Sequence, residues 1–384
     1  MSLSATKTPV FDHSWPAAPS ESGKATTAAL KPFDLVGSDE KRVWESLRAR
    51  YDRFRSPFFS VAFSEAVHAV RQDVEVAVVY QNERPIAFLP LHRQGQSCFP
   101  VGRFFNDAHN IVCDPGLNIP WHWLLRQIGC NAYHFHALVG QPLDEMPPHC
   151  CHRKVRSFRC EIGDNPVQYL RDLGRAHKTI GRQGQKTRKM AREVGTVQFE
   201  FDCRDVERLR QAIRWKRNQY QRTHILDLFS TPWTMELVER LFGNIDRDQT
   251  PRGILSTLNA GGRTVAAHFG MLDGDLLHYW FPAYDPAFAR YSPGTGLFVS
   301  ILEAAEAQGL RCIDMGYGEQ PYKRKQTDET DEVGQGCISP SFTYRLLRCG
   351  QAHLIDGVKT LPLKSSLKRV GRSIWPNAGR SKLT

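Results

Sequence analysis

Apolar and polar residues follow one another along the chain with a spacing that switches between the helical period and strict alternation. This switching predicts a mixed α/β protein. In the first half, helices are expected at 39–55, 60–70 and 121–128, and strands at 75–80, 85–92 and 131–139. A polar turn at 81–84 between the first two strands predicts that they pair as a hairpin.

The second half predicts the order β-α-α-β-β-β-α-β. Strands are expected at 196–201, 252–258, 264–272, 276–283 and 311–315, and helices at 204–222, 232–244 and 297–308. The tripeptide Asp273-Gly274-Asp275 predicts a hairpin turn. A long basic helix is expected at 166–194, weakened by its glycines, ahead of this series.

The length of 384 residues, with 41% hydrophobic residues, predicts two domains that each bury a core. We expect a disordered leader at 1–30, a first domain at 31–150, a connecting segment with the basic helix at 151–195, a second domain at 196–345 and a basic tail at 346–384. The fold class is therefore α/β (α+β), and each domain is expected to hold a mixed sheet flanked by helices.

Several classes of protein are excluded by composition. The ten cysteines contain no C-x-x-C pair, which favours free thiols over a disulfide framework, and their spacing predicts no metal site. No apolar run approaches the roughly 18–20 residues that span a bilayer. The leader lacks an apolar signal core, so a cytoplasmic location is expected.

The net charge of +11 is concentrated in three segments. Residues 171–192 carry eight basic residues and one acidic residue, and 204–222 and 356–384 are also strongly basic, which leaves the remainder slightly acidic. This pattern favours local anion contacts over general nucleic-acid binding. The basic helix is open to two interpretations, a solvated face or a site for an anionic acceptor or tRNA. The basic, partly apolar tail could lie on the inner membrane face.

The sequence Y-S-P-G-T-G at 291–296 lies between a strand and a helix. A glycine-containing loop that opens a helix directs backbone N–H groups at one point, where the helix dipole adds positive charge. Such a loop suits a pyrophosphate group. The expected contacts are Arg290, Tyr291, Ser292, Gly294, Thr295 and Gly296. Without further context, a plain turn followed by a helix cap would explain the loop equally well.

Two further stretches carry a resemblance to a known family. They are G-R-T-V-A-A-H-F-G from Gly262 and D-M-G-Y-G-E-Q-P-Y-K at 314–323. With the glycine loop, they resemble the GNAT-superfamily acyltransferase domain of the CelD-like branch, linked to cellulose and exopolysaccharide biosynthesis and related to the Fem aminoacyltransferases. The resemblance covers about 165–330 closely and 31–150 loosely, through P-I-A-F-L-P-L at 85–91 and F-N-D-A-H at 105–109. The chain departs from the family at Tyr291, where Gln or Arg is usual.

The resemblance implies two GNAT-like domains in tandem, the first degenerate, each with a mostly antiparallel sheet. It also implies an acyl-CoA such as acetyl-CoA as co-substrate, with no permanently bound cofactor. The reaction expected is N- or O-acyl transfer to a sugar or polysaccharide precursor. A Fem-like aminoacyltransferase that uses aminoacyl-tRNA, or a catalytically degenerate GNAT scaffold, remains an alternative.

Acyl transfer from a thioester needs a base for the nucleophile and an acid for the leaving thiolate. His268 is a candidate base in mid-strand, and Asp314 and Glu319 are candidate carboxylates near the end of the last strand. Tyr322 is a candidate acid, while Tyr284 and Lys323 are expected to contact substrate. Each has a structural alternative: a packed histidine, a surface carboxylate, a wall aromatic or a solvated lysine.

Overall fold

The computed structural model describes residues 26–140, 143–144, 146–147, 149–244, 250–341 and 344. Residues 1–25 of the predicted leader and the whole basic tail at 346–384 lie outside these residues. The predictions of disorder at 1–25 and of a membrane-surface tail therefore concern residues that the structure does not describe. Within the described part of the chain, no helix is both long enough and apolar enough to cross a membrane.

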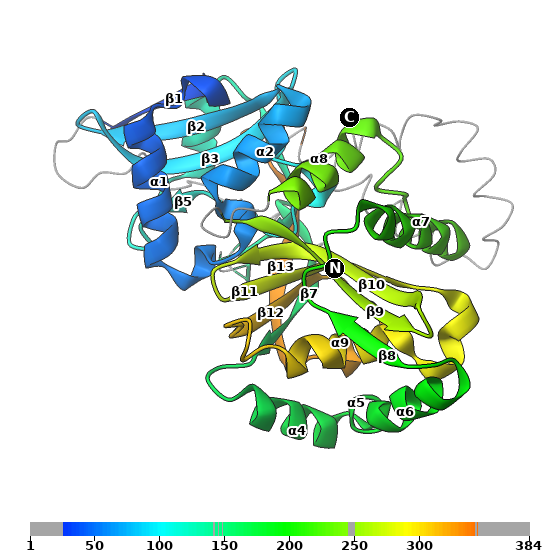
Figure 1. Cartoon of the computed structure of the whole chain (residues 1–384). Helices are drawn as coiled ribbons and strands as arrows, with labels where there is room; N and C mark the ends of the chain where they lie inside the picture. The colour runs from blue at the N-terminus through cyan, green and yellow to red at the C-terminus, as the bar shows by residue number, and fades with distance from the viewer. Residues whose placement is uncertain are drawn as a thin grey trace, which may run out of the picture.

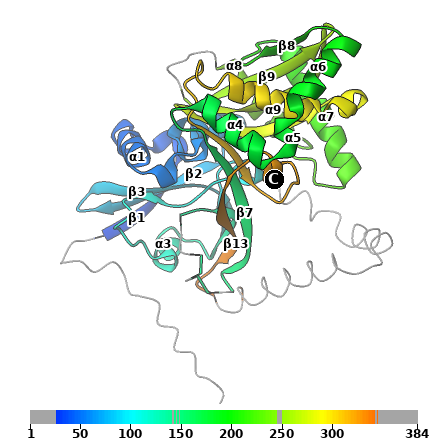
Figure 2. The same ribbon diagram turned by 90° about the horizontal axis from the view of Figure 1, so that it is seen from below.

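The N-terminal half is a sheet covered on both faces (Figures 1 and 2). Its elements are β1 (Thr26–Pro32), α1 (Ser38–Arg50), α2 (Val61–Arg71), β2 (Val74–Gln81), β3 (Arg84–Gln94), β4 (Ser97–Pro100), β5 (Val112–Cys113), α3 (Trp121–Gln127) and β6 (Ala132–Leu138). Helices α1 and α2 pack on one face and α3 on the other, because side chains of β2 and β3 alternate between two apolar clusters.

Strand β1 corrects the predicted extent of the leader. Residues 26–30 were expected to be disordered, yet they pair antiparallel with β2, from Thr26 opposite Gln81 to Pro32 opposite Glu75. Their small and polar side chains give no clear alternation, and an edge strand is held chiefly by its backbone ladder. Pairing with β2 therefore orders a segment whose composition alone resembles a leader.

The C-terminal half contains the remaining elements. They are β7 (Cys151–Glu161), α4 (Pro166–Ala176), α5 (Lys178–Gly181), α6 (Gln183–Glu193), β8 (Val197–Glu200), α7 (Val206–Thr223), α8 (Pro232–Gly243), β9 (Arg252–Ala260), β10 (Arg263–Asp273), β11 (Leu276–Tyr284), α9 (Pro293–Glu303), β12 (Cys312–Tyr317) and β13 (Glu329–Ile338). Helices α7 and α8 pack on one face of the sheet, whereas α9 lies on the other face, between the sheet and helices α4–α6 (Figure 1).

One continuous sheet runs through both halves, in the order β1-β2-β3-β4-β6-β13-β7-β12-β11-β10-β9-β8, with β5 added to β3. The join is made by β13, which comes last in the sequence yet pairs with β6 of the N-terminal half and with β7 (Figure 2). Most described strand pairs are antiparallel, and each half has one parallel pair, β4–β6 and β11–β12. The predicted mixed, mostly antiparallel α/β class is confirmed, although the two halves share a single sheet.

The predicted basic helix is three helices, α4, α5 and α6. Asn165 caps α4 by accepting a hydrogen bond from the Gln168 N–H, and the chain turns again at His177 and Arg182. A Cβ atom on Gly181 would lie 2.6 Å from the carbonyl O of Gly174. The glycines that weaken a single helix therefore allow short helices to fold back on one another over α9.

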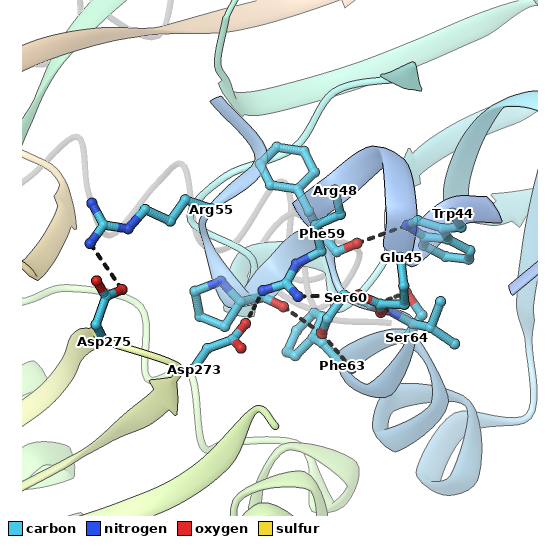
Figure 3. Close-up of polar contacts among 12 residues, drawn as sticks. Trp44, Glu45, Arg48, Arg55, Phe59, Ser60, Phe63, Ser64, Asp273 and Asp275 are labelled. Carbon is cyan, nitrogen blue, oxygen red and sulfur yellow. Dashed lines mark hydrogen bonds and ion pairs between the residues drawn. The ribbon is translucent and has the colours of Figure 1, made fainter. Parts of the chain in front are cut away.

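Two ion pairs fasten the N-terminal half to the β10–β11 hairpin (Figure 3). Arg48 on α1 pairs with Asp273, and Arg55 lies 3.0 Å from Asp275. Both aspartates belong to the predicted Asp273-Gly274-Asp275 turn, which the structure confirms. The turn therefore links the two halves of the molecule next to the first residues of β11.

Candidate active site

Strands β11 and β12 begin as a parallel pair and then separate. Their pairing covers three positions, Leu276–Cys312, Leu277–Ile313 and His278–Asp314. Beyond His278, β11 continues to Tyr284 without β12, and its register with β10 shifts between Phe269 and Met271. A β-bulge of this kind bends a strand. The divergence leaves the β12-facing backbone edge of β11 open toward the core.

His278 lies at the point of divergence between two carboxylates. Its Nε2 is 3.3 Å from Oδ2 of Asp107, which comes from the N-terminal half, and its Nδ1 is 3.7 Å from Oδ2 of Asp314. Burial by itself would lower the pKa of His278, but the two carboxylates raise it to about 9. Burial likewise opposes ionisation of Asp314, yet His278 keeps the pKa of that carboxyl below its usual value. The three groups therefore form a charged cluster in the core between the halves.

Two buried lysines hold the separated strand edges. Lys216 of α7 donates from Nζ to the carbonyl O of Pro282 on β11, at 3.1 Å. Lys323 donates to the carbonyl O atoms of Gly316 and Tyr317 on β12, at 3.2 and 2.6 Å. Burial, and to a lesser extent the positive charge of Lys323, together lower the pKa of Lys216 to about 7. Burial also lowers the pKa of Lys323 to about 8, against the pull of Asp107 and Asp314.

Four tyrosines belong to the same region, and Nζ of Lys216 lies 5.5 Å from the ring centroid of Tyr220. Burial raises the pKa of each hydroxyl well above the usual value, so all of them stay protonated at neutral pH. They are Tyr220, Tyr279, Tyr317 and Tyr322. The region around the separated strands thus contains two lysines whose pKa values lie near neutrality and four tyrosines that keep their protons at that pH.

The first turn of α9 carries the predicted glycine loop. Pro293 is the first helical residue, and Ser292 precedes it in the left-handed conformation without capping the helix through its side chain. Gly294 and Thr295 lie in the first turn, whose N–H groups have no acceptor within a helix. Lys186 of α6 donates to Oγ of Ser292 at 2.7 Å, which brings an exposed ammonium group to the helix start. A helix start of this kind with an ammonium group beside it attracts anions.

The other predicted loop residues have different surroundings. Gly296 is buried, and a Cβ there would lie 3.1 Å from Nε2 of Gln183 and 3.2 Å from Leu258. Tyr291 is also buried, and its hydroxyl donates to Glu193 at 2.7 Å. Arg290 is exposed and reaches the same two groups. Tyr291 therefore anchors α6 to the loop through its ring and hydroxyl.

Tyr284, a predicted substrate contact, ends β11 and is 42% exposed. Its ring lies against Gly294, where an added Cβ would be 3.5 Å from Cδ1. The predicted substrate contact and the predicted phosphate loop are therefore neighbours on the surface.

Two predicted catalytic residues have restricted chemistry. His268 is fully buried, stacks on Tyr279 with ring centroids 4.0 Å apart, and has a pKa well below the usual value because of burial and nearby positive charge. Such an imidazole is a weak base. Glu319 lies near the surface, where Arg156 grips both carboxylate oxygens at 3.0 Å and Arg324 also pairs with it. These arginines hold the pKa of Glu319 far below neutrality.

The structure brings together Asp314, Tyr322 and Lys323 among the predicted residues, and adds three that the sequence analysis missed. Lys216 occupies the buried face of α7 with Leu209, Ile213 and Tyr220, so a charged residue in an apolar helical stripe was the available signal. Asp107 lies in the F-N-D-A-H segment, which was noted only for its resemblance. His278 stands within an otherwise apolar strand, a weak signal by itself.

A cavity of about 250 Å³, the inner cavity, opens between the halves beside this cluster. Its walls include Arg53, Arg55, Asp107, Arg159, Asp314 and Asp331. Within the described part of the chain, no group of three or more His, Cys, Asp or Glu side chains could hold a metal ion. The arrangement combines the start of α9 with Lys186 beside it, two separated strands, lysines with lowered pKa values and a polar cavity.

Comparison with known proteins agrees with this geometry. Residues 178–324 match the acetyltransferase (GNAT) domain family, whereas no curated protein sequence is significantly similar. The fold is similar to that of FemX, with a TM-score of 0.51 and 10% identity over 80% of this chain and 97% of that chain.

Two other solved structures are also similar. One is the C-terminal domain (DUF2156) of a protein assigned as a lysylphosphatidylglycerol synthetase from Agrobacterium fabrum (TM-score 0.49, 14% identity, 83% of this chain and 97% of that chain). The other is a tandem GNAT protein from the clavulanic acid biosynthesis pathway (TM-score 0.47, 9% identity, 83% of this chain and 100% of that chain). The family match and the likeness to FemX together show that the chain has the GNAT fold, contains an acetyltransferase (GNAT) domain over residues 178–324, and is an acyltransferase.

Proposed function

We propose that the protein transfers an acyl group from acyl-CoA to an amine or hydroxyl of an acceptor bound in the inner cavity. The observation that carries the proposal is the divergence of β11 and β12. Past this point β11 runs from His278 of the charged cluster to Tyr284, whose ring lies against Gly294 at the start of α9. Donor and acceptor would meet at the open edge of β11.

The start of α9 suits the donor's pyrophosphate. The N–H groups of its first turn and the helix dipole attract phosphate oxygens, and Lys186 adds a positive charge at Ser292. Gly294 allows close approach, since no side chain stands between its backbone and a ligand. The pantetheine chain would then run along the open edge of β11, where extended backbone groups can hydrogen-bond to its amides.

The groups around the divergence suit both proton transfers. Asp107 lines the inner cavity, and its Oδ2 lies 3.3 Å from Nε2 of His278, so this carboxylate is placed to accept the proton of the acceptor. Lys323, with a pKa of about 8, is matched to a leaving thiolate, because a free cysteine thiol has a pKa of about 8.5. Lys216 would favour negative charge developing on the thioester oxygen.

We keep a sugar or a polysaccharide precursor as the proposed acceptor, on the strength of the sequence resemblance. The arginines and aspartates of the inner cavity can bind a molecule with several hydroxyl and amino groups. Release of free CoA thiol, measured with a chromogenic disulfide, would rank amino sugars and nucleotide sugars against free amino acids.

Acyl-CoA use is tested by calorimetric titration with acetyl-CoA and longer acyl-CoAs. We expect binding by the wild-type chain and loss of binding in Gly294→Asp, whose carboxylate would stand in the anion site. Lys178→Met, at an exposed position on α5, serves as the control for a change in surface charge. No binding at millimolar acyl-CoA would overturn the donor assignment.

A second candidate donor is aminoacyl-tRNA, favoured by the exposed basic side chains on α4–α6 beside the start of α9. A tRNA donor would co-purify with the chain and bind with a steep dependence on salt. A catalytically degenerate scaffold would bind neither donor. Competition between acetyl-CoA and tRNA in one titration separates these cases.

A further inference from the structure

A second cavity, the outer cavity, adjoins the inner one. It has a volume of about 410 Å³, and its walls include Arg53, Cys113, Leu117, Ile119, Trp121 and Met146. Arg53 and Gly140 line both cavities. The two spaces therefore meet at Arg53, with the charged cluster of Asp107 and Asp314 at one end and apolar walls at the other.

Two side chains that line the outer cavity, Trp121 and Arg53, each have a buried N–H group without an acceptor. Trp121 is 8% exposed, and its Nε1 is buried without a partner while Tyr133 stacks on its ring, with centroids 4.9 Å apart. Nε of Arg53 is also buried without a partner. A buried donor without an acceptor is unfavourable, so a ligand that supplies an acceptor to it is bound more tightly.

Arg53 forms no ion pair among the described residues, although the carboxylate of Asp114 lies within electrostatic reach of it. Its Nη2 donates to the carbonyl O of Cys113 at 3.1 Å. By contrast, the neighbouring Arg55 pairs with Asp275 and Glu161. Arg53 thus lies at the junction of the two cavities. Its guanidinium is held by the neutral carbonyl of Cys113 and remains available to an anion.

From these observations we propose that the outer cavity binds the distal end of the acceptor, and that this acceptor is an elongated molecule with an anionic group beside an apolar or aromatic portion. The anionic group lies at Arg53, an acceptor oxygen receives the Trp121 Nε1–H bond, and the apolar portion packs against Leu117 and Ile119. The nucleophile then extends past Arg53 into the inner cavity, toward Asp107. The assignment of this ligand as acceptor rests on the proposed function.

The test uses two fluorescent probes that differ by one carboxylate. Nα-dansyl-lysine carries an aromatic group, a carboxylate and an amine at the end of a chain, and dansylcadaverine is the same molecule without the carboxylate. We expect the wild-type chain to bind Nα-dansyl-lysine at least tenfold more tightly, as followed by dansyl emission. Equal affinities, or no binding of Nα-dansyl-lysine at millimolar concentration, would overturn the proposal.

Substitutions test which residues bind the probes and cause the preference for Nα-dansyl-lysine. Arg53→Met is expected to reduce the affinity ratio of the two probes to near one, whereas Arg50→Met, at an exposed position on α1, keeps it. Trp121→Phe should weaken both probes several-fold, and Trp123→Phe, on the same helix, should not. If Arg53→Met does not fold, Arg53→Lys takes its place and should retain the preference. An unchanged ratio in Arg53→Met, or unchanged binding in Trp121→Phe, would contradict the assignment.

The proposal can fail separately from the donor assignment. No acyl-CoA takes part in the probe titration, and Gly294→Asp, which should lose acetyl-CoA, is expected to bind Nα-dansyl-lysine as the wild type does. Probe binding that disappears in Gly294→Asp would show that the probe occupies the donor site, and would overturn the outer cavity as its location.

Discussion

Replacing Lys216 with methionine should make the protein more stable and less active. The ammonium group is buried on α7 and held by a single carbonyl, and its pKa is lowered from 10.5 to about 7. A shift of about 3.5 units corresponds to roughly 5 kcal/mol of unfavourable free energy when the group is charged in the folded state. Loss of the bond to Pro282 offsets about 1 kcal/mol of this.

The direction of the pH dependence follows from the state, folded or unfolded, in which Lys216 keeps its proton. Between pH 7 and 10.5 the unfolded chain holds the Lys216 proton and the folded chain does not, so wild-type stability rises with pH over this interval. Methionine carries no such penalty. The variant should therefore gain about 4 kcal/mol in the free energy of unfolding at pH 6, and the gain should fall below about 1 kcal/mol by pH 10.

Urea unfolding of wild type, Lys216→Met and the exposed control Lys178→Met at pH 6, 7.5, 9 and 10 measures this difference directly. Turnover of acetyl-CoA should fall at least tenfold in Lys216→Met and stay unchanged in the control. A stability difference that does not vary with pH would refute the lowered pKa. A stabilised variant with full turnover would remove Lys216 from the reaction.

Three further predictions concern other parts of the site. Gly294→Asp should weaken acetyl-CoA at least tenfold in calorimetry without lowering the unfolding midpoint, since an added Cβ there makes only ordinary contact with Tyr284. Glu319→Gln should keep most of its turnover, because Arg156 and Arg324 hold the carboxylate in a surface ion pair; a hundredfold loss would return Glu319 to the reaction. His278→Asn should be destabilised by about 3 kcal/mol below pH 6.5, and the difference should disappear as the pH rises through 9, because the raised pKa of His278 stabilises the folded state only while the ring is protonated. Urea unfolding at pH 6 and 9.5 checks this, and a constant difference would contradict it.

Local pattern was sufficient for most elements of the fold. The helix from Val206 to Thr223 and the hairpin at Asp273–Asp275 agree with the predicted ranges within a few residues. Strand β13 was not predicted, since its sequence E-T-D-E-V-G-Q-G-C-I has little alternation. Two neighbouring strands hold it through backbone bonds, and Gly336 is needed because a Cβ there would lie 1.8 Å from the carbonyl O of Cys150. Such pairing over long sequence distances leaves no local signal.

The candidate site, like the fold, could be predicted from the sequence only in part. Motif spacing predicted a helix at 297–308 after the glycine loop, but α9 begins four residues earlier, at Pro293, so Gly294, Thr295 and Gly296 lie within the helix. The prediction that Asp314 lies near the end of the last strand of the series agrees with its place in β12. The meeting of Asp107 with His278 could not be predicted, because it joins residues 171 positions apart across two halves of the molecule. That contact depends on the docking of one half against the other.

The position of β13 has a consequence for how the chain is made. Strand β13, which completes the N-terminal sheet, is among the last described segments to leave the ribosome. One edge of β6 is therefore unpaired while almost two hundred residues are synthesised. An open edge invites pairing with another chain. A chain ended after the GNAT-matching segment, at residue 328, would keep the donor loop yet leave β6 and β7 without their shared partner, and we expect it to aggregate. The smallest unit that folds is therefore longer than the unit that the family comparison marks.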